Sequence, residues 1–383
     1  MSATRKPVGP LASACHAARK TSPCQVLASR TTHFYLLEKR NIIVIGASTG
    51  GFEVLKQLVA ALPADLDAAI FIVWHMAPDM VGILPQVLNQ QQTLLAANAV
   101  DNEPIYTNRI YVAPPDKHLL LEKGFVRVTR GPKENRFRPA VDPLFRSAAH
   151  SYGSRVIGLI LSGALDDGTA GLWAIKNRGG LAIVQEPAEA DVSSMPASAL
   201  AAVKVDYQLP LAKMAPLLTK LTADYAPPAR AAAAEEHRKT RLEVRLAAEE
   251  PVLEQGTLPF RQLTPYACPE CHGVLSGITD GPLLRYRCHT GHAYSADSLL
   301  AALTERIEDT LWSAIRGVEE SILLLNNLGD HHAENNQPKL AAAYFQKAQE
   351  AAGRAAAVRQ TLFAHEQLAA ASISRQAAAS EAV

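Results

Sequence analysis

The stretch "NIIVIGASTGGFEVL", Asn41 to Leu55, decides the fold, because an apolar segment of strand character leads through a glycine-rich turn into a helical pattern. Further strand-like segments follow, and helical patterns such as "GFEVLKQLVAAL" lie between them. Several are near-continuous apolar runs, typical of strands covered on both faces. We predict an α/β fold, a doubly wound, mostly parallel sheet with helices on both faces. The predicted strands are "NIIVIG" (41–46), "AAIFIVWH" (68–75), "RIYVAP" (109–114), "FVRVTR" (125–130), "RVIGLILSG" (155–163), "GLAIVQE" (180–186) and "DYQLPL" (206–211).

The glycine-rich turn admits two functional interpretations. A dinucleotide fingerprint, G-x-G-x-x-G, needs glycine at its second place and an acidic residue about 20 residues further on. Gly46 and Gly51 fit the outer places, but Ser48 occupies the middle one, and the next strand ends in Trp74 and His75. A Rossmann-type oxidoreductase is therefore disfavoured. The turn also fits G-x-S-x-G, which places a serine nucleophile between a strand and a helix, while a plain helix-capping turn stays open as the structural alternative.

Topology brings a histidine and an aspartate toward this serine. If the first two strands are neighbours, His75 emerges beside Ser48. The strand at 155–163 can return on the other side of the first strand, and Asp166 and Asp167 follow it. These residue types form a nucleophile, a base and a group that orients the base. Either ring nitrogen of the histidine can serve as the base, and a structural histidine and a plain "DDG" turn are the alternatives.

The composition limits the class of protein. The chain has 383 residues, enough for about two domains, with 48% apolar residues and a formal net charge of +1. This charge predicts no nucleic-acid partner, and no apolar run reaches the roughly 18 residues of a membrane-spanning helix. The five cysteines are too few and too clustered for a secreted disulfide framework. We therefore predict a cytoplasmic protein that does not span a membrane.

The chain divides into five regions. Residues 1–40 are a basic leader predicted to be disordered, and a misassigned start site or a transit peptide would look similar. Residues 41–222 form the predicted catalytic domain, and residues 223–262 a linker with one exposed helix. Residues 263–296 contain a Cys/His cluster. Residues 297–383 have apolar residues at helical spacing, which predict a pair of antiparallel helices with the apolar stripe as their core.

The Cys/His cluster has the spacing of a zinc site. "CPECHG" and "CHTGHAYS" give C-x2-C, a gap of 16 residues and C-x3-H, spacing that lets four ligands close a tetrahedron. The candidate ligands are Cys268, Cys271, Cys288 and His292. His272 and His289 are alternative fourth ligands. Such a site has no open position, so its zinc would be structural, and the module with its helical pair is predicted to dock or oligomerise.

Six blocks of the predicted catalytic domain resemble a known family. They are "IIVIGASTGG", "FIVWHM", "IYVAPPDKHLLL", "RPAVDPLF", "GLILSGALDDGTAGL" and "VQEPAEADVSSMPASAL". In this order and at this spacing, over about residues 41 to 220, the chain resembles the catalytic domain of the CheB family, the chemotaxis protein-glutamate methylesterases. By this resemblance the nucleophile falls on Ser48, the base on His75 and the aspartate on Asp167.

The resemblance implies a function. A CheB-type enzyme hydrolyses γ-carboxyl methyl esters of glutamate on chemoreceptor signalling helices, releasing methanol, and some members deamidate glutamine there. This chemistry needs no metal or organic cofactor. The backbone amide of Ala164, by similarity, and that of Thr49, at the helix start, are candidate oxyanion donors. The expected partners are a methylated chemoreceptor or a related signalling protein, together with methyltransferase or kinase components of the same pathway.

The resemblance also predicts the rim of the site. Arg138 and Asp142 in "RPAVDPLF" and Met195 in "SSMP" are expected to contact a receptor helix, with a helix-entry cap and a loop against the core as structural alternatives. The familiar chemotaxis enzyme has a receiver domain before its catalytic domain, and the forty residues of the leader are too few to fold one. Control by phosphorylation of such a domain is therefore not expected here. Separately, a non-catalytic signalling adaptor that docks through its C-terminal module is the alternative function.

Overall fold

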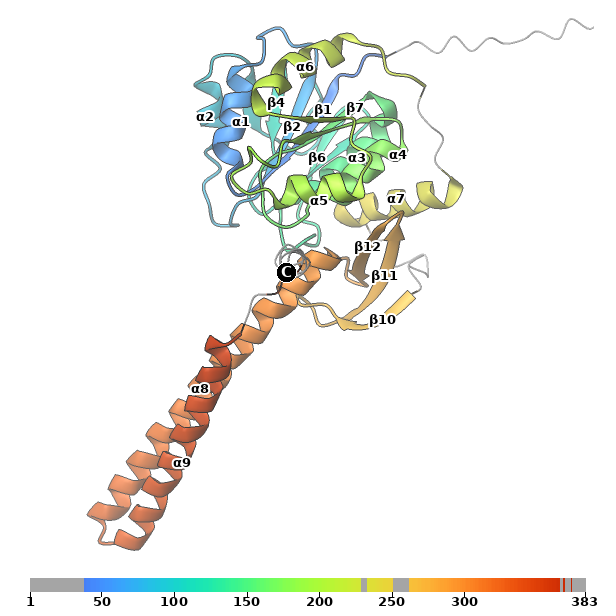
Figure 1. Ribbon diagram of the computed structural model, residues 1–383. Coiled ribbons are helices and arrows are strands. Elements are labelled where there is room, and N and C mark those ends of the chain that lie inside the picture. Colours follow the sequence, from blue (N-terminus) through green and yellow to red (C-terminus); the bar gives the residue numbers. More distant parts are fainter. Residues whose placement is uncertain (1–37, 229–232, 251–261, 366–367, 369–372, 374–383) are drawn as a thin grey trace, which may run out of the picture. The chain divides into compact units, whose positions relative to one another are not determined.

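A computed structural model describes residues 38–228, 233–250 and 262–365, together with residues 368 and 373. Most of the predicted leader and part of the predicted linker lie outside the described residues. Strands and helices alternate through the first part of the described chain (Figure 1). The elements of this part are β1 (Ile42–Ala47), α1 (Gly51–Ala60), β2 (Ala69–Trp74), α2 (Leu84–Asn89), β3 (Leu95–Asn98), β4 (Arg109–Val112), β5 (His118–Glu122), β6 (Phe125–Thr129), α3 (Val141–Tyr152), a 3-10 turn (Gly153–Arg155), β7 (Val156–Ile160), α4 (Thr169–Asn177), β8 (Leu181–Gln185), α5 (Ser194–Ala202), β9 (Tyr207–Leu209) and α6 (Leu211–Ala223).

Seven parallel strands form the central sheet, in the order β3-β4-β2-β1-β7-β8-β9. β1 lies in the middle and pairs with β2 on one side and β7 on the other, so that Gly46 is opposite both Val73 and Ile160. All six residues of β1 are buried, which explains its unbroken apolar run. The predicted order of these three strands is confirmed, and their carboxyl ends meet at one edge of the sheet.

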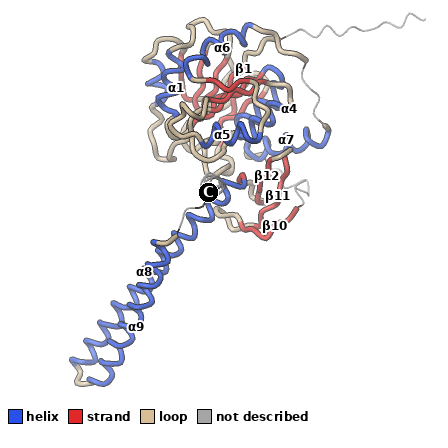
Figure 2. Tube along the Cα trace, viewed as in Figure 1, coloured by secondary structure: helices blue, strands red, loops and turns tan. Residues whose placement is uncertain are grey.

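Helices cover both faces of the sheet, and Figure 2 shows the strands between the two groups of helices. On one face α1, α2 and α6 contribute Leu55, Leu88 and Leu218 to the core. On the other face α3 and α4 contribute Phe145 and Leu172, and α5 packs beside them. The predicted doubly wound α/β architecture is therefore confirmed.

The strand predicted at 125–130 exists, but it lies outside the parallel sheet. β6 pairs with β5 in a separate antiparallel hairpin. Lys123 and Gly124 form the turn between them, and Gly124 has φ 86°. β5 and the short edge strand β3 are absent from the sequence prediction, because segments of four or five residues without strict alternation give a weak strand signal.

The predicted linker contains a packed helix, α7 (Ala234–Ala247), in place of an exposed one. Thr240, Glu243, Leu246 and Ala247 are buried on this helix, and the Thr129 hydroxyl donates a hydrogen bond to the Ala247 carbonyl. The prediction of an exposed helix is wrong because Glu243 belongs to a buried ion-pair cluster whose other members lie far away in the sequence.

The C-terminal region begins with a four-stranded antiparallel sheet that is absent from the sequence prediction. Its strands are β10 (Gln262–Ala267), β11 (Val274–Asp280), β12 (Leu283–Cys288) and β13 (Ala293–Ser295). The helices α8 (Ala296–Glu334) and α9 (Pro338–Phe363) then form the predicted pair. The predicted apolar stripe is core only in part, since Ala348 and Leu362 are buried while Ile307 is 50% exposed.

Among the described helices, none combines the length and the apolar character that are needed to cross a membrane.

Candidate active site

Ser48 lies directly after β1, at the turn into α1. Its N–H donates to the Ser162 carbonyl at 3.0 Å, and the Gly51 N–H donates to the Ser48 carbonyl at 2.9 Å. Gly50 has φ 76°, and a Cβ at this position would lie 2.6 Å from the Cβ of Asp191. The turn therefore requires glycine here. This tight turn holds the Ser48 hydroxyl at the carboxyl edge of the sheet.

His75 follows β2, the neighbour of β1. Its Nδ1 lies 3.1 Å from Ser48 Oγ, and its Nε2 lies 2.7 Å from Asp167 Oδ2. An ionised carboxylate only accepts hydrogen bonds, so this contact assigns the ring hydrogen to Nε2 and leaves the Nδ1 lone pair for the Ser48 hydroxyl. The Phe137 ring stacks on the imidazole, with centroids 3.9 Å apart and planes 11° apart. Of the two nitrogens that the sequence leaves open, Nδ1 faces the serine.

Asp167 is buried and receives hydrogen bonds from several groups. The Val141 N–H donates to Oδ2 at 2.6 Å, Asn135 Nδ2 donates to Oδ1 at 2.8 Å, and the Asp142 N–H lies 3.3 Å from Oδ1. Val141 and Asp142 begin α3, so the positive end of this helix faces the carboxylate. Burial alone would raise the pKa of Asp167, but the hydrogen bonds from His75, Val141 and Asn135 outweigh it and lower the pKa. An ionised Asp167 is suited to orient His75.

The neighbouring Asp166 has a different partner. Its Oδ1 accepts a hydrogen bond from the Ser295 hydroxyl at 2.6 Å. Burial raises the pKa of Asp166 to about 7. Of the two adjacent aspartates, only Asp167 makes a hydrogen bond to His75.

Ser48 and His75 line a cavity of about 560 Å³. Thr49 and Ala164, the two predicted oxyanion donors, line the same cavity, and within the described part of the chain neither N–H has an acceptor. Trp74 Nε1 donates to the Ser48 carbonyl at 3.1 Å and so fixes the turn. Free N–H groups beside a serine hydroxyl can bind the oxyanion of a tetrahedral intermediate.

The three predicted rim residues differ in their exposure. Arg138 lines the cavity, but its guanidinium donates to Asp116 at 2.6 Å and to backbone carbonyls. Asp142 and Met195 are only 2% and 0% exposed, so the prediction that they contact a receptor helix is wrong. Asp142 accepts a hydrogen bond from the Gly171 N–H at 2.6 Å, and Met195 belongs to the core. Both lie in the first turns of helices that pack on one face of the sheet, α3 and α5.

Two residues beside the triad are absent from the sequence prediction. Asn135 and Phe137 lie in the irregular segment between β6 and α3, and Asn135 has a left-handed backbone with φ 49°. No periodicity or short motif identifies them. Their only signal is their position just before the block "RPAVDPLF".

The predicted metal ligands converge in the C-terminal sheet. The ligand atoms of Cys268, Cys271, Cys288 and His292 all lie within 4.8 Å of one another. Cys271 Sγ is 3.6 Å from Cys288 Sγ, and His292 Nδ1 is 3.6 Å from Cys288 Sγ and 3.8 Å from Cys268 Sγ. The two alternative histidines, His272 and His289, are exposed and do not join this group.

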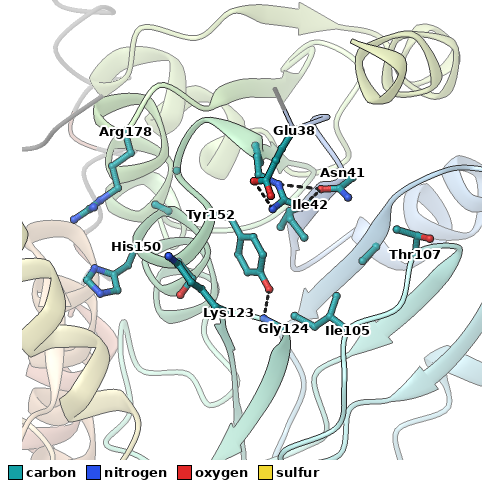
Figure 3. Close-up of a pocket in the computed structure, with 15 residues that line it drawn as sticks. Glu38, Asn41, Ile42, Ile105, Thr107, Lys123, Gly124, His150, Tyr152 and Arg178 are labelled. Atoms are coloured by element: carbon teal, nitrogen blue, oxygen red, sulfur yellow. Dashed lines mark hydrogen bonds and ion pairs between the residues drawn. The ribbon is translucent and has the colours of Figure 1, made fainter. Parts of the chain in front are cut away.

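A second cavity, of about 590 Å³, lies near the starts of β1 and β2, at the opposite edge of the sheet (Figure 3). Figure 3 shows the Tyr152 hydroxyl beside Gly124, whose N–H donates to it at 2.8 Å. Arg155 in this cavity is paired with Glu38 at 2.7 Å. The described lining residues include His150, Ser151 and Glu38, but the Ser151 hydroxyl donates to the Leu121 carbonyl at 2.8 Å and Glu38 pairs with Arg155, so these residues form no second triad.

Comparisons with known proteins find one family model and several similar proteins. Residues 43–218 match the family model described as CheB methylesterase. The protein-glutamate methylesterase/protein-glutamine glutaminase 2 of Rhizobium johnstonii is 38% identical over 178 residues, which cover 45% of this chain and 48% of that protein. A Leptospira interrogans protein, provisionally given the same two activities, is 40% identical over 180 residues, or 47% of this chain and 93% of that protein. The crystal structure of the Thermotoga maritima CheB methylesterase catalytic domain is similar at 35% identity, covering 47% of this chain and 98% of that one, with a TM-score of 0.46.

Proposed function

The chain belongs to the CheB methylesterase family, and from this premise we propose that it hydrolyses γ-methyl esters of glutamate side chains on chemoreceptor-type signalling proteins. The observation that supports the proposal is the chain of hydrogen bonds from Ser48 through His75 to Asp167, at 3.1 and 2.7 Å, beside an open cavity. The relatives are named for this activity. The alternative prediction, a non-catalytic adaptor, does not require these hydrogen bonds, because docking needs no nucleophile or base.

The proposed first half-reaction makes an acyl-enzyme. Ser48 Oγ attacks the ester carbonyl carbon while His75 Nδ1 takes the hydroxyl proton. Asp167 stabilises the resulting imidazolium through the hydrogen bond to Nε2. The N–H groups of Thr49 and Ala164 bind the oxyanion of the tetrahedral intermediate. The carbonyl-to-methoxy bond then breaks, and the Nδ1 proton moves to the methoxy oxygen, so methanol leaves.

The second half-reaction returns the enzyme to its starting state. A water molecule gives a proton to His75 Nδ1 as its oxygen attacks the acyl carbon. The bond from that carbon to Ser48 Oγ breaks, and Nδ1 returns the proton to the serine. The products are a glutamate side chain and free enzyme. The same steps on a glutamine side chain release ammonia, and the names of the relatives include this glutaminase activity.

The proposal also defines the partners of the protein. The substrate ester must come from a methyltransferase that acts on the same glutamate side chains, so the two enzymes work on one signalling protein. We place the reaction in the cytoplasm, in keeping with the low and clustered cysteine content. Besides the ester and water, the proposed chemistry uses side chains and backbone amides of this chain.

The test is methanol release from methylated cytoplasmic fragments of chemoreceptors of the same organism, with the purified full chain. We expect release by the wild type and a loss of several orders of magnitude in Ser48→Ala, as for other triad nucleophiles. Ser321→Ala, on the exposed surface of α8, is the matched control and should react like the wild type. A folded wild-type protein that releases no methanol, or a Ser48→Ala variant that still releases it, would refute the proposal.

A further inference from the structure

Asn135 connects the catalytic aspartate to the C-terminal region. Its side chain is buried, and its Nδ2 donates to Asp167 Oδ1 at 2.8 Å and to Asp142 Oδ2 at 3.0 Å. Its Oδ1 accepts from the Ser295 N–H at 2.8 Å and from the Ser298 hydroxyl at 3.0 Å. The orientation of the amide is unambiguous, because the carboxylates accept hydrogen bonds and a backbone N–H only donates. One side chain thus joins the triad to the start of α8.

The start of α8 is itself fixed. Ser295 is its N-cap residue and accepts a hydrogen bond from the Ser298 N–H at 3.0 Å. The Asn135 N–H donates to the Ala293 carbonyl at 2.8 Å, so the backbone of β13 also contacts this segment. The Phe137 ring, two residues further on, stacks on His75. The segment that supports two members of the triad is therefore held on its other side by β13 and α8.

Buried ion pairs join the same segment to β12 and α7. Glu134 pairs with Arg146 of α3 and, at 2.9 Å, with Arg287 of β12. Glu243 of α7 pairs with Arg285 at 2.8 Å and with Arg287 at 3.0 Å. All five side chains are buried. Removing β12 would leave Glu134 without one of its partners, and an unpaired buried charge is strongly unfavourable. The C-terminal sheet is therefore part of the support of the active site.

The Cys/His group joins two turns, since Cys268 and Cys271 lie between β10 and β11, whereas Cys288 ends β12 and His292 directly precedes β13. Zn–S bonds of about 2.3 Å and Zn–N bonds of about 2.1 Å place tetrahedral sulfur atoms about 3.8 Å apart and a sulfur and a nitrogen about 3.6 Å apart. The observed separations of 3.6 to 3.8 Å fit these values. Cys288 and His292 flank the turn that joins β12 to β13, where the Cys288 N–H donates to the His292 carbonyl at 3.0 Å. A metal at this group would fix that turn.

We propose that Cys268, Cys271, Cys288 and His292 bind one zinc ion, and that this ion positions Asp167 through β13 and Asn135, so that metal loading of the C-terminal module sets the rate at Ser48. The inference rests on the proposed function of the triad. Without the ordered turn, Ser295 and Ser298 no longer fix the amide of Asn135, and Asp167 loses an oriented donor. Asn135 acts as a positioning residue, since it touches the aspartate and not the substrate.

The test compares zinc content with the reactivity of Ser48 in the full chain. Zinc is measured by mass spectrometry, and Ser48 by its rate of labelling with a serine-directed phosphonate, which needs no receptor substrate. We expect one zinc per chain in the wild type and in His289→Ala, and none in Cys288→Ser. Labelling and kcat should fall about 10- to 100-fold in Cys288→Ser and in Asn135→Ala, as for loss of a hydrogen bond to a charged group, with little change in KM. Asn135→Ala should keep its zinc.

A double-variant cycle separates positioning from general damage. If zinc acts through Asn135, loss of the metal in the Asn135→Ala background lowers the labelling rate little further, whereas independent effects multiply. Ser298→Ala leaves every metal ligand in place and should slow labelling about three- to tenfold at full zinc content. It keeps the test valid if Cys288→Ser unfolds the module.

Three results would overturn the inference: a wild type that binds no zinc, a zinc-free variant that labels at the wild-type rate, or multiplicative losses in the cycle. A wild-type protein that is labelled at Ser48 but releases no methanol would contradict the proposed function and not this inference. The labelling rates of the variants would then still test the role of zinc.

Discussion

Replacing Asp167 by asparagine tests the tautomer of His75. Every group around the carboxylate is a donor: His75 Nε2 and the Val141 N–H at Oδ2, and Asn135 Nδ2 and the Asp142 N–H at Oδ1. An asparagine offers one acceptor oxygen and one NH2 group. If the NH2 group takes the place of Oδ1, it faces two other donors, Asn135 Nδ2 and the Asp142 N–H. If it faces His75, the ring can move its hydrogen to Nδ1 and accept at Nε2, so that only the Val141 N–H is opposed.

The second orientation is therefore favoured, and it places a hydrogen on the nitrogen that must accept the Ser48 proton. A wrong tautomer of this kind lowers kcat by about 10⁴-fold, or roughly 5 kcal/mol of transition-state stabilisation. The opposed N–H of Val141 should lower the free energy of unfolding by about 1–3 kcal/mol. Methanol release and phosphonate labelling measure the first effect, and denaturant unfolding measures the second.

Asp166→Asn is the matched control. Its side-chain oxygen can still accept from the Ser295 hydroxyl, so we expect a rate close to that of the wild type. An Asp167→Asn variant that stays folded and keeps more than about a tenth of the wild-type kcat would refute the assignment of the ring hydrogen to Nε2. A large loss in Asp166→Asn with little loss in Asp167→Asn would show that the other aspartate orients the base.

Three further predictions follow from the same contacts. Gly50→Ala should destabilise the protein by about 1–3 kcal/mol and lower its activity, because the φ of 76° and a contact of 2.6 Å both oppose a Cβ. Gly124→Ala is the control, since Gly124 has a positive φ but open space around it, and this variant should keep its activity. Thermal unfolding and methanol release check both variants. Since the pKa of Asp166 is raised from 3.8 to about 7, its carboxyl binds a proton more tightly in the folded state than in the unfolded state. The stability that this proton contributes is therefore present at low pH and is lost as the pH rises from about 4 through 7. The free energy of unfolding of Asp166→Asn should decline less over this pH range than that of the wild type. Phe137→Ala should lower kcat with a smaller change in KM, because the His75 ring loses the stacked ring that holds it. Phe125→Ala, at a side chain on β6 that is 48% exposed, is the control and should leave kcat unchanged. An unchanged kcat in Phe137→Ala would contradict a role for the stack.

The sequence predicts those parts of the site whose geometry is local or follows from strand order. Ser48 is placed by a turn whose glycines adjoin it in the chain, and His75 and Asp167 each follow a buried strand that neighbours β1. Because parallel strands end at a common edge, neighbours in the sheet bring their following residues together. The choice between Nδ1 and Nε2 lies beyond this reasoning, since it depends on the side from which the loops after β2 and β7 approach each other.

The support of the site is beyond prediction for a different reason. Asn135 meets Ser295, and Glu134 meets Arg287, across 160 and 153 residues of sequence. The sequence of a charged helix such as α7 is the same whether Glu243 faces water or faces two buried arginines. The composition of α7 therefore indicates an exposed helix, although the structure buries Glu243. Glu243, whose charge contributes to the prediction of a linker, pairs with the arginines of β12. A charge-rich segment between two predicted modules is therefore weak evidence that the modules are independent, and in this chain the ion pairs provide a route by which the C-terminal sheet can influence the catalytic aspartate.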